Sequence, residues 1–351
     1  MSSMVILAPN WLGDAVMALP AIADLRREMP DMAITVAARP TIAPLFQLVP
    51  GVRDTILLER RASFRDVGGW RAIGGELSGR GFDIALLLPN SLHAAIVASR
   101  ADIPERWGYR TARRGPLLTR AIQPTAGLHQ VEYYQHLVHG LGFPSGPIEP
   151  RVEVSSDRRE AGTRLLADAG WDGRTPLVAL APGAAYGGAK RWPPEYFAEL
   201  AVMLASDGVQ SVVLGSAADE PTAGEVARAF PLAESRGRQA RVGTRDPQRV
   251  ALLTLVGRTD IPTLAGVMAA CRALVTNDSG AMHLGAAVGM PITAVFGPTD
   301  EEASRPMGDA HVVATHPVWC RPCMLRECPI DHRCMRGVSV QRVFDAARKS
   351  L

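Results

Sequence analysis

The stretch LVTNDSGAMHLGAAVGMPITAVFGPTD, residues 274–300, decides the fold class of this chain. It opens on an apolar run and continues through a turn of Asn, Asp, Ser and Gly into a helical pattern at Met282–Val288. A second β-branched run follows at Ile292–Phe296. Two strand candidates joined by a helix favour a parallel βαβ unit, because parallel strands need such a crossover.

The same alternation extends outward over the rest of the chain and predicts an α/β architecture with parallel sheets. The expected strands are Met4–Ala8, Ala33–Ala37, Thr55–Leu58, Ile84–Leu88, Leu177–Ala181, Ser211–Leu214, Leu252–Val256, Ala273–Thr276 and Ile292–Phe296. The expected helices are Ala15–Glu28, Ala72–Gly79, Leu92–Ser99, Gln130–Leu141, Pro194–Ala205, Glu220–Ala229, Ile261–Ala270 and Met282–Val288.

A Pro-, Gly- and Ser-rich stretch, GFPSGPIEPRVEVSS at 142–156, predicts a linker between two domains. A length of 351 residues also fits two domains, at about 150 residues each. We therefore expect domains at 1–150 and 151–351, the second with a Cys-rich segment at 320–334 and a C-terminal helix. Ligands of such open sheets bind beyond the carboxyl ends of the strands, here in a cleft between the halves.

Composition excludes several classes of protein. The chain is 47% apolar and 21% charged, which argues against disorder. No window reaches the roughly 18 apolar residues of a membrane span, and the first residues lack the basic region of a secretory signal. The net charge of +3 is too small and dispersed for a nucleic-acid-binding protein. Only two of the 38 basic residues are lysines, Lys190 and Lys349.

Three loops that follow expected strands carry candidate site residues. The first, Pro9–Asp14, holds Asn10, Gly13 and Asp14. Asp14 is suited to act as a general base toward a substrate hydroxyl. It is equally suited to cap the following helix or to complement its dipole.

The second loop reads PGAAYGGAKRWP at 182–193 and holds Gly183, Tyr186 and Lys190. Glycines let the backbone approach an anion, and a lysine neutralises phosphate charge. The pattern is not a P-loop, because Ala189 stands at the lysine position and no Ser or Thr follows. The alternative is a flexible surface loop.

The third loop holds Asp278, Ser279 and Gly280 before a helix that carries His283. The first N–H groups of a helix form a phosphate site, and Asp278 can accept hydrogen bonds from sugar hydroxyls. The alternative is an ordinary N-cap with a core histidine. Asp219 follows another strand and is suited to bind ribose, or to serve as a first-turn acid.

Four cysteines gather at Cys320, Cys323, Cys328 and Cys334. Their spacing permits a structural zinc site, two local disulfides or, less well, an iron–sulfur cluster. We expect a clip for the C-terminal segment, with zinc and disulfides left open. A metal-clipped nucleic-acid-binding protein is the non-enzyme alternative.

Three runs together resemble the lipopolysaccharide heptosyltransferases: NWLGDAVM at 10–17, PGAAYGGAKRWP at 182–193 and LVTNDSGAMHLGAAVGMPITAVFGPTD. NWLGD and AKRWP indicate the heptosyltransferase II branch, and the Cys-rich tail is similar to segments of that branch. Some relatives have hydroxyl residues where this chain has Ala184, Ala185 and Tyr186, so the resemblance implies that backbone amides make those phosphate contacts here.

The resemblance implies a GT-B fold, with two Rossmann-like domains facing a cleft. The N-terminal domain would bind a lipid A–Kdo–heptose acceptor and the C-terminal domain ADP-L-glycero-β-D-manno-heptose. It implies an inverting, metal-independent transfer to the inner core, with Asp14 as base and Lys190 on the leaving diphosphate. The donor would also contact Asp278, Ser279, Gly280 and His283.

The resemblance also implies a cytoplasmic enzyme at the inner face of the inner membrane, with transient membrane contact and no nucleic-acid partner. Arg113 and Arg114 form a candidate membrane-touching loop, or else a solvated one. The alternatives for activity are heptosyltransferase I or III, or another glycosyltransferase or epimerase of GT-B architecture.

Overall fold

The computed structural model describes residues 2–58, 67–239 and 252–351. The chain divides into two compact units, Met1–Glu153 and Val154–Leu351. The change of unit falls inside the Pro- and Gly-rich stretch. Within the described residues, no helix combines the length and apolarity needed to cross a bilayer.

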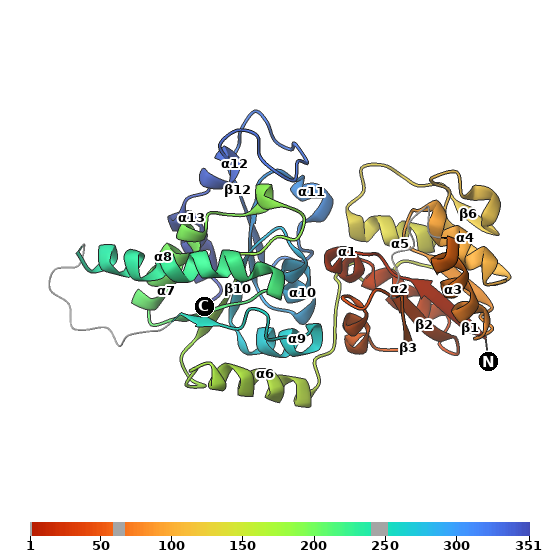
Figure 1. Cartoon of the computed structure of the whole chain (residues 1–351), viewed down its shortest axis with the longest axis horizontal. Coiled ribbons are helices and arrows are strands. Elements are labelled where there is room, and N and C mark those ends of the chain that lie inside the picture. The colour runs from red at the N-terminus through yellow and green to blue at the C-terminus, as the bar shows by residue number, and fades with distance from the viewer. Residues whose placement is uncertain (1, 59–66, 240–251) are drawn as a thin grey trace. The chain divides into compact units, whose positions relative to one another are not determined.

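The first unit is built on a six-stranded, all-parallel sheet with the order β3-β2-β1-β4-β5-β6 (Figure 1). Its strands are β1 (Ser3–Leu7), β2 (Ala33–Ala38), β3 (Val52–Leu57), β4 (Ile84–Leu87), β5 (Glu105–Tyr109) and β6 (Arg120–Ile122). Its helices are α1 (Leu12–Met17), α2 (Leu19–Glu28), α3 (Val67–Ser78), α4 (Leu92–Arg100) and α5 (Gln130–Gly140).

The second unit has another six-stranded parallel sheet, in the order β12-β11-β10-β7-β8-β9. Its strands are β7 (Leu177–Ala181), β8 (Gln210–Val213), β9 (Leu253–Thr254), β10 (Ala273–Asn277), β11 (Ile292–Phe296) and β12 (His311–Thr315). Its helices are α6 (Ser156–Asp168), α7 (Pro194–Ser206), α8 (Glu220–Gln239), α9 (Ile261–Ala270), α10 (Gly280–Val288), α11 (Glu301–Ser304), α12 (Arg333–Arg336) and α13 (Val340–Arg348).

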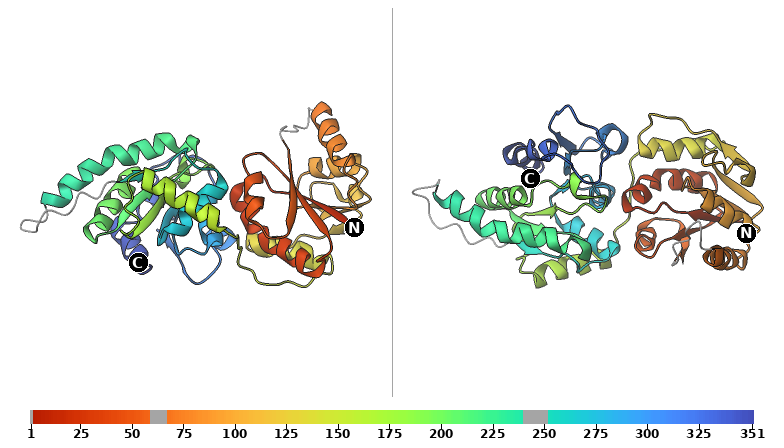
Figure 2. Two further views of the ribbon diagram at one scale, coloured as in Figure 1. Left: turned by 90° about the horizontal axis from the view of Figure 1, so that it is seen from below. Right: turned by 45° about the horizontal axis from the view of Figure 1, so that its top comes forward.

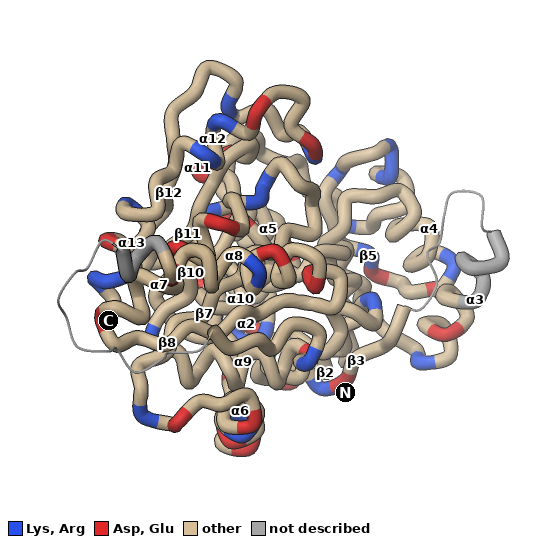
Figure 3. Tube along the Cα trace, turned by 60° about the vertical axis from the view of Figure 1, so that its left-hand side comes forward, with Lys and Arg blue, Asp and Glu red and all other residues tan. Residues whose placement is uncertain are grey.

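Helices cover both faces of each sheet (Figure 2). In the second unit α7 packs against α8 and α13, and α6 packs against α9. The core beneath α7 and α13 is apolar throughout, and Trp192, Phe197 and Phe344 are among its largest members. Basic and acidic residues are interspersed along the trace of both units (Figure 3).

The expected fold class, two Rossmann-like parallel α/β units of GT-B type, is confirmed. The helix expected at 15–28 is instead two helices, α1 and α2, which meet at Ala18. Pro20 explains the break, because proline lacks an N–H and clashes with the carbonyl four residues earlier.

The sequence reading missed α6 and the strands β5, β6 and β12. Helix α6 is strongly charged and buries only Gly162 and Leu166, so its apolar period is weak. Two glycines explain how it still packs closely on α9. A Cβ on Gly266 would come within 2.0 Å of the Arg158 carbonyl oxygen, so the two helices meet backbone to backbone.

Candidate functional site

The strand order of the second unit has a topological switch point between β7 and β10. Strands are added on opposite sides of this point: β8 and β9 lie to one side, and β11 and β12 lie to the other. Ligands of open α/β sheets bind at such switch points, beyond the carboxyl ends of the strands. The loop after β7 is residues 182–193, here called the Lys190 loop, and the loop after β10 begins at Asp278.

Lys190 and Asp278 meet at this switch point. The Lys190 ammonium lies 2.5 Å from Oδ2 of Asp278, and their side chains are 13% and 7% exposed. The Thr299 hydroxyl, after β11, donates a 2.7 Å hydrogen bond to the same oxygen. The structure thus brings two sequence-predicted residues together, with a buried positive charge held by one carboxylate.

Asn277 holds both ends of the Lys190 loop. Its amide nitrogen donates to the Pro182 carbonyl at 2.7 Å, and its side-chain oxygen accepts the Trp192 N–H at 2.9 Å. Asn277 and Trp192 are fully buried. The indole N–H of Trp192 donates to the Val338 carbonyl, which fixes the end of the loop in the core. Both ends of the Lys190 loop are therefore anchored, which differs from the flexible surface loop of the alternative interpretation.

The middle of the Lys190 loop packs on the Cys-rich segment, residues 320–334. The Tyr186 hydroxyl donates to the Met324 carbonyl at 2.8 Å. The N–H of Gly188 donates to a Glu327 carboxylate oxygen, and the N–H of Ala189 donates to the Arg326 carbonyl. Two loop amides are thus engaged by this segment.

The first turn of α10 lacks a side-chain cap. Ser279 occupies the N-cap position, yet its side chain accepts no helix N–H. Its hydroxyl instead lies 3.2 Å from that of Thr276. Gly280 begins the helix, and His283 is buried one turn later. The Ser279 side chain therefore leaves the first N–H groups of α10 without an acceptor from the N-cap residue.

Asp219 closes a capping box at the 3-10 turn Ala217–Asp219. Its Oδ2 accepts hydrogen bonds from both the N–H and the hydroxyl of Ser216. Its Oδ1 faces Gly183, where an added Cβ would lie only 2.2 Å away. Gly183 thus permits close contact between two strand-end loops, and Asp219 lies beside the Lys190 loop, so its suggested contact with ribose stays a prediction.

The first unit has its own switch point, between β1 and β4. The loop after β1 carries Asn10, which is exposed, and Gly13 and Asp14, which are half-buried. Trp11 is the N-cap of α1, and Asp14 lies in the first helical turn. Asp14 is therefore not the N-cap residue of α1, but its place in the first turn complements the helix dipole. Burial and the nearby Asp14 carboxylate raise the pKa of the Tyr134 hydroxyl on α5.

Arg114 does not form the solvated or membrane-touching loop that the sequence suggested. It is fully buried and donates to the carbonyl oxygens of Tyr109 and Pro89. Burial lowers the pKa of its guanidinium to about 10. Arg114 ties the ends of β4 and β5 together, and the neighbouring Arg113 is exposed, with a φ of 59°.

All five cysteines are free thiols, so the disulfide alternative is not seen. Cys320, Cys323, Cys328 and Cys334 line one cavity of about 20 Å³. In the described part of the chain, no three His, Cys, Asp or Glu side chains are arranged to hold a metal ion. As placed, the thiols do not fit the expected zinc site. Cys334 is buried, and the other three thiols are half-buried around the same cavity.

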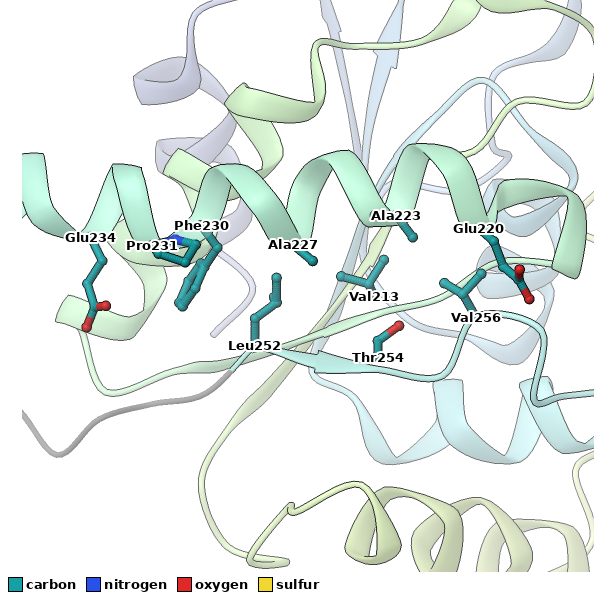
Figure 4. Close-up of a pocket in the computed structure, with 11 residues that line it drawn as sticks. Val213, Glu220, Ala223, Ala227, Phe230, Pro231, Glu234, Leu252, Thr254 and Val256 are labelled. Atoms are coloured by element: carbon teal, nitrogen blue, oxygen red, sulfur yellow. The ribbon is translucent and has the colours of Figure 1, made fainter.

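A larger cavity of about 650 Å³ lies between α8 and β9 (Figure 4). It is lined by apolar side chains such as Val213, Phe230 and Leu252, with Glu220 and Glu234 at its ends. None of the sequence-predicted site residues lines it. The cavity and the switch-point site are therefore separate features of the second unit.

Comparison with known proteins identifies the family. The sequence profile of glycosyltransferase family 9 (heptosyltransferase) matches residues 70–333. The chain belongs to glycosyltransferase family 9. Lipopolysaccharide heptosyltransferase 2 of Salmonella typhimurium (strain LT2) is 30% identical over 313 residues, which cover 87% of this chain and 85% of that protein. The Escherichia coli K12 protein of that name gives the same identity and coverage.

Solved structures agree with this family 9 assignment. The structure of E. coli ADP-heptose LPS heptosyltransferase II superimposes with a TM-score of 0.81 at 28% identity, covering 99% of this chain and 98% of that one. A family 9 glycosyltransferase from Veillonella parvula gives a TM-score of 0.82 at 20% identity, covering 99% and 96%. The second likeness concerns the fold alone. The resemblance stated from sequence motifs is confirmed.

Each unit has a residue or two near its switch point that sequence reasoning did not select. Asn277 and Thr299 act between loops that are distant in sequence, and Tyr134 lies beside Asp14 from another helix. Both Asn277 and Thr299 lie in a quoted motif. Asn277 precedes Asp278 and Thr299 follows the strand expected at Ile292–Phe296, and these positions were the available signal. Nothing in the sequence singled out Tyr134.

Proposed function

We propose that this family 9 glycosyltransferase moves L-glycero-D-manno-heptose from ADP-L-glycero-β-D-manno-heptose to the heptose/Kdo inner core of lipopolysaccharide. The observation that carries the donor half is the Lys190–Asp278 pair at the switch point of the second unit. The names of the relatives at 30% identity, lipopolysaccharide heptosyltransferase 2, support the acceptor class.

The second unit is the donor-binding unit in this proposal. The ammonium of Lys190 neutralises the charge that builds on the diphosphate as the bond to the sugar breaks. Asp278 accepts hydrogen bonds from sugar hydroxyls, and the N–H groups at Ser279 and Gly280 bind phosphate oxygen. His283, buried one turn into α10, also contacts the donor in this proposal. When the Lys190 ammonium binds the diphosphate instead of Asp278, the Thr299 hydroxyl still donates its hydrogen bond to Asp278.

The first unit binds the acceptor, and Asp14 is the general base. In an inverting transfer the acceptor hydroxyl oxygen attacks the anomeric carbon on the face opposite the diphosphate. The new C–O bond forms as the bond to ADP breaks, and the hydroxyl proton passes to the Asp14 carboxylate. ADP leaves with the electron pair. Each step uses a side chain of this protein, so the proposed transfer needs no metal at the reacting centre.

The decisive experiment is mass spectrometry of inner-core acceptors incubated with the purified protein and ADP-heptose. A gain of one heptose on a Kdo acceptor that already carries one heptose is expected. Transfer to an acceptor without that first heptose would instead favour heptosyltransferase I, and no transfer from ADP-heptose would overturn the proposal. Other nucleotide sugars, tested side by side, distinguish other GT-B enzymes.

Two variants test the roles assigned to the side chains. Asp14→Asn keeps the shape of the side chain and removes the base, so turnover should fall by at least about a thousandfold while ADP binding is retained. Lys190→Ala should weaken ADP binding and turnover together. Unimpaired turnover of the first variant, or unchanged ADP affinity of the second, contradicts the respective role.

The lipid-anchored acceptor places this enzyme in the cytoplasm, at the inner face of the inner membrane. Because Arg114 is buried, only Arg113 of that pair is available to an anionic surface. Flotation with vesicles that contain anionic lipid should retain the protein, and neutral vesicles should retain less. Equal retention on both kinds of vesicle would argue against electrostatic membrane contact.

A further inference from the structure

The Cys-rich segment is fixed to the loop that follows β11. The N–H groups of Cys323 and Met324 both donate to the Pro298 carbonyl at 2.9 Å. The Arg321 guanidinium donates to the Gly297 carbonyl at 2.8 Å and forms a 2.6 Å ion pair with Glu301. These contacts hold the segment at the carboxyl edge of the sheet, where the donor site lies.

The same segment touches the Lys190 loop so closely that a side chain would not fit between them. A Cβ on Gly187 would lie 2.3 Å from the Arg326 carbonyl oxygen. That oxygen accepts the Ala189 N–H at 2.9 Å, one residue before Lys190. The backbone of Arg326 is therefore fixed beside Lys190, whatever its side chain does.

Two cations share the ring of Tyr186. The Lys190 ammonium lies 4.8 Å from the ring centroid, and the Arg326 guanidinium carbon lies 5.2 Å from it. The two charges differ in their partners. Lys190 is paired with Asp278, whereas the exposed Arg326 guanidinium has no hydrogen bond or ion pair among the described residues.

An arginine in this state has its five donors available for an anion. The planar guanidinium fork matches phosphate oxygens in pairs, and its stacking on an aromatic ring limits the orientations it takes. A diphosphate presents two phosphate groups, so a second cation that shares the Tyr186 ring with Lys190 complements it. Glu327 is adjacent, but its carboxylate accepts the Gly188 N–H at 3.1 Å.

From these contacts we infer that Arg326 is a second donor-binding residue, which binds the diphosphate of the nucleotide sugar beside Lys190. The Cys-rich segment is then one wall of the donor site, and its hydrogen bonds to Ala189 and Pro298 hold the Arg326 backbone in place. This inference rests on the proposed function, because it takes the ligand of the Lys190 loop to be a nucleoside diphosphate.

Calorimetric titration of ADP into the full-length protein and into Arg326→Ala tests this inference. The substitution keeps the carbonyl that accepts the Ala189 N–H, so the loop should remain in place. ADP affinity should fall roughly tenfold, the low end for a charge-assisted contact at an exposed site. Arg326→Lys, which keeps the charge without the fork, should lose less.

A matched control comes from the same segment. Arg333 also stacks on an aromatic ring, 5.8 Å from the centroid of Trp319, but it pairs with Asp331 and not with the Lys190 loop. Arg333→Ala should therefore bind ADP as the unaltered protein does. Adenosine, followed by ligand-observed NMR, should bind Arg326→Ala unchanged because it has no phosphate.

The outcomes separate the two proposals. Wild-type ADP affinity in Arg326→Ala overturns the role of Arg326 and leaves the proposed function standing. Equal losses for ADP and adenosine also overturn it, because they show a disturbed loop in place of a lost phosphate contact. Failure of the unaltered protein to bind ADP would overturn the proposed function itself.

Discussion

Replacement of Asn277 by alanine tests whether one buried amide holds the Lys190 loop in its binding conformation. The side chain is fully buried and satisfies two backbone groups, the Pro182 carbonyl and the Trp192 N–H. Alanine leaves both without their partner. Each unsatisfied buried group costs about 1–3 kcal/mol, so we expect the free energy of unfolding to fall by about 3 kcal/mol.

The same substitution should weaken ADP binding, because Lys190 lies between the two anchored ends of the loop. Part of the binding free energy would be spent on ordering the loop again, and a loss of about tenfold in affinity corresponds to about 1.4 kcal/mol. Urea unfolding followed by circular dichroism measures the stability, and calorimetry measures the ADP affinity.

Two further variants sharpen the Asn277 experiment. Asn277→Asp keeps the acceptor for the Trp192 N–H but places a carboxylate against the Pro182 carbonyl, so it should be no more stable than the alanine variant. Asn10→Ala removes an exposed asparagine and should change stability by less than about 0.5 kcal/mol. An Asn277→Ala protein as stable as Asn10→Ala would refute this account of the loop.

Three other predictions follow from buried groups. Lys190→Met should lower the free energy of unfolding by about 3 kcal/mol, because it leaves the Asp278 carboxylate buried without a counter-charge. Adding Asp278→Asn to this variant should restore most of the lost stability. Urea unfolding of both proteins measures the two effects. Gly266→Ala should force α6 and α9 apart and cost more than about 2 kcal/mol in thermal unfolding, whereas Gly75→Ala, in a helix with open space around it, should be neutral or stabilising. Burial raises the pKa of the Cys271 thiol to about 12. Between pH 9 and 12 the unfolded chain loses this proton and the folded chain keeps it. The free energy of unfolding should therefore fall by about 1.4 kcal/mol per pH unit relative to that of Cys271→Ala. Equal pH slopes for the two proteins would contradict this prediction.

The central strands of both sheets were predictable because burial on two faces gives continuous apolar runs. Strand β12 is half-exposed at the sheet edge and gives no such run. Helix α6 was missed for a related reason: it meets α9 through glycines, which contribute nothing to an apolar pattern. Elements that pack by backbone contact, or on one side only, leave a weak trace in the sequence.

Lys190 and Asp278 were predictable as members of two separate loops, since each follows an expected strand. The ion pair between the two side chains was not predictable, because it depends on the strand order that brings β7 beside β10. The burial of Arg114 was equally hidden. Its guanidinium is satisfied by backbone carbonyls, and no pattern of side chains marks such acceptors.

The scarcity of lysine gives the Lys190 loop a use in chemical labelling. A ribose-derived dialdehyde of ADP forms a Schiff base with an amine, and arginine does not react in this way. The chain offers two side-chain amines, Lys349 near its carboxyl terminus and Lys190 beside Asp278. After borohydride reduction, a modified peptide spanning 182–193 would record occupancy of the proposed ADP site directly, and excess unmodified ADP should protect it.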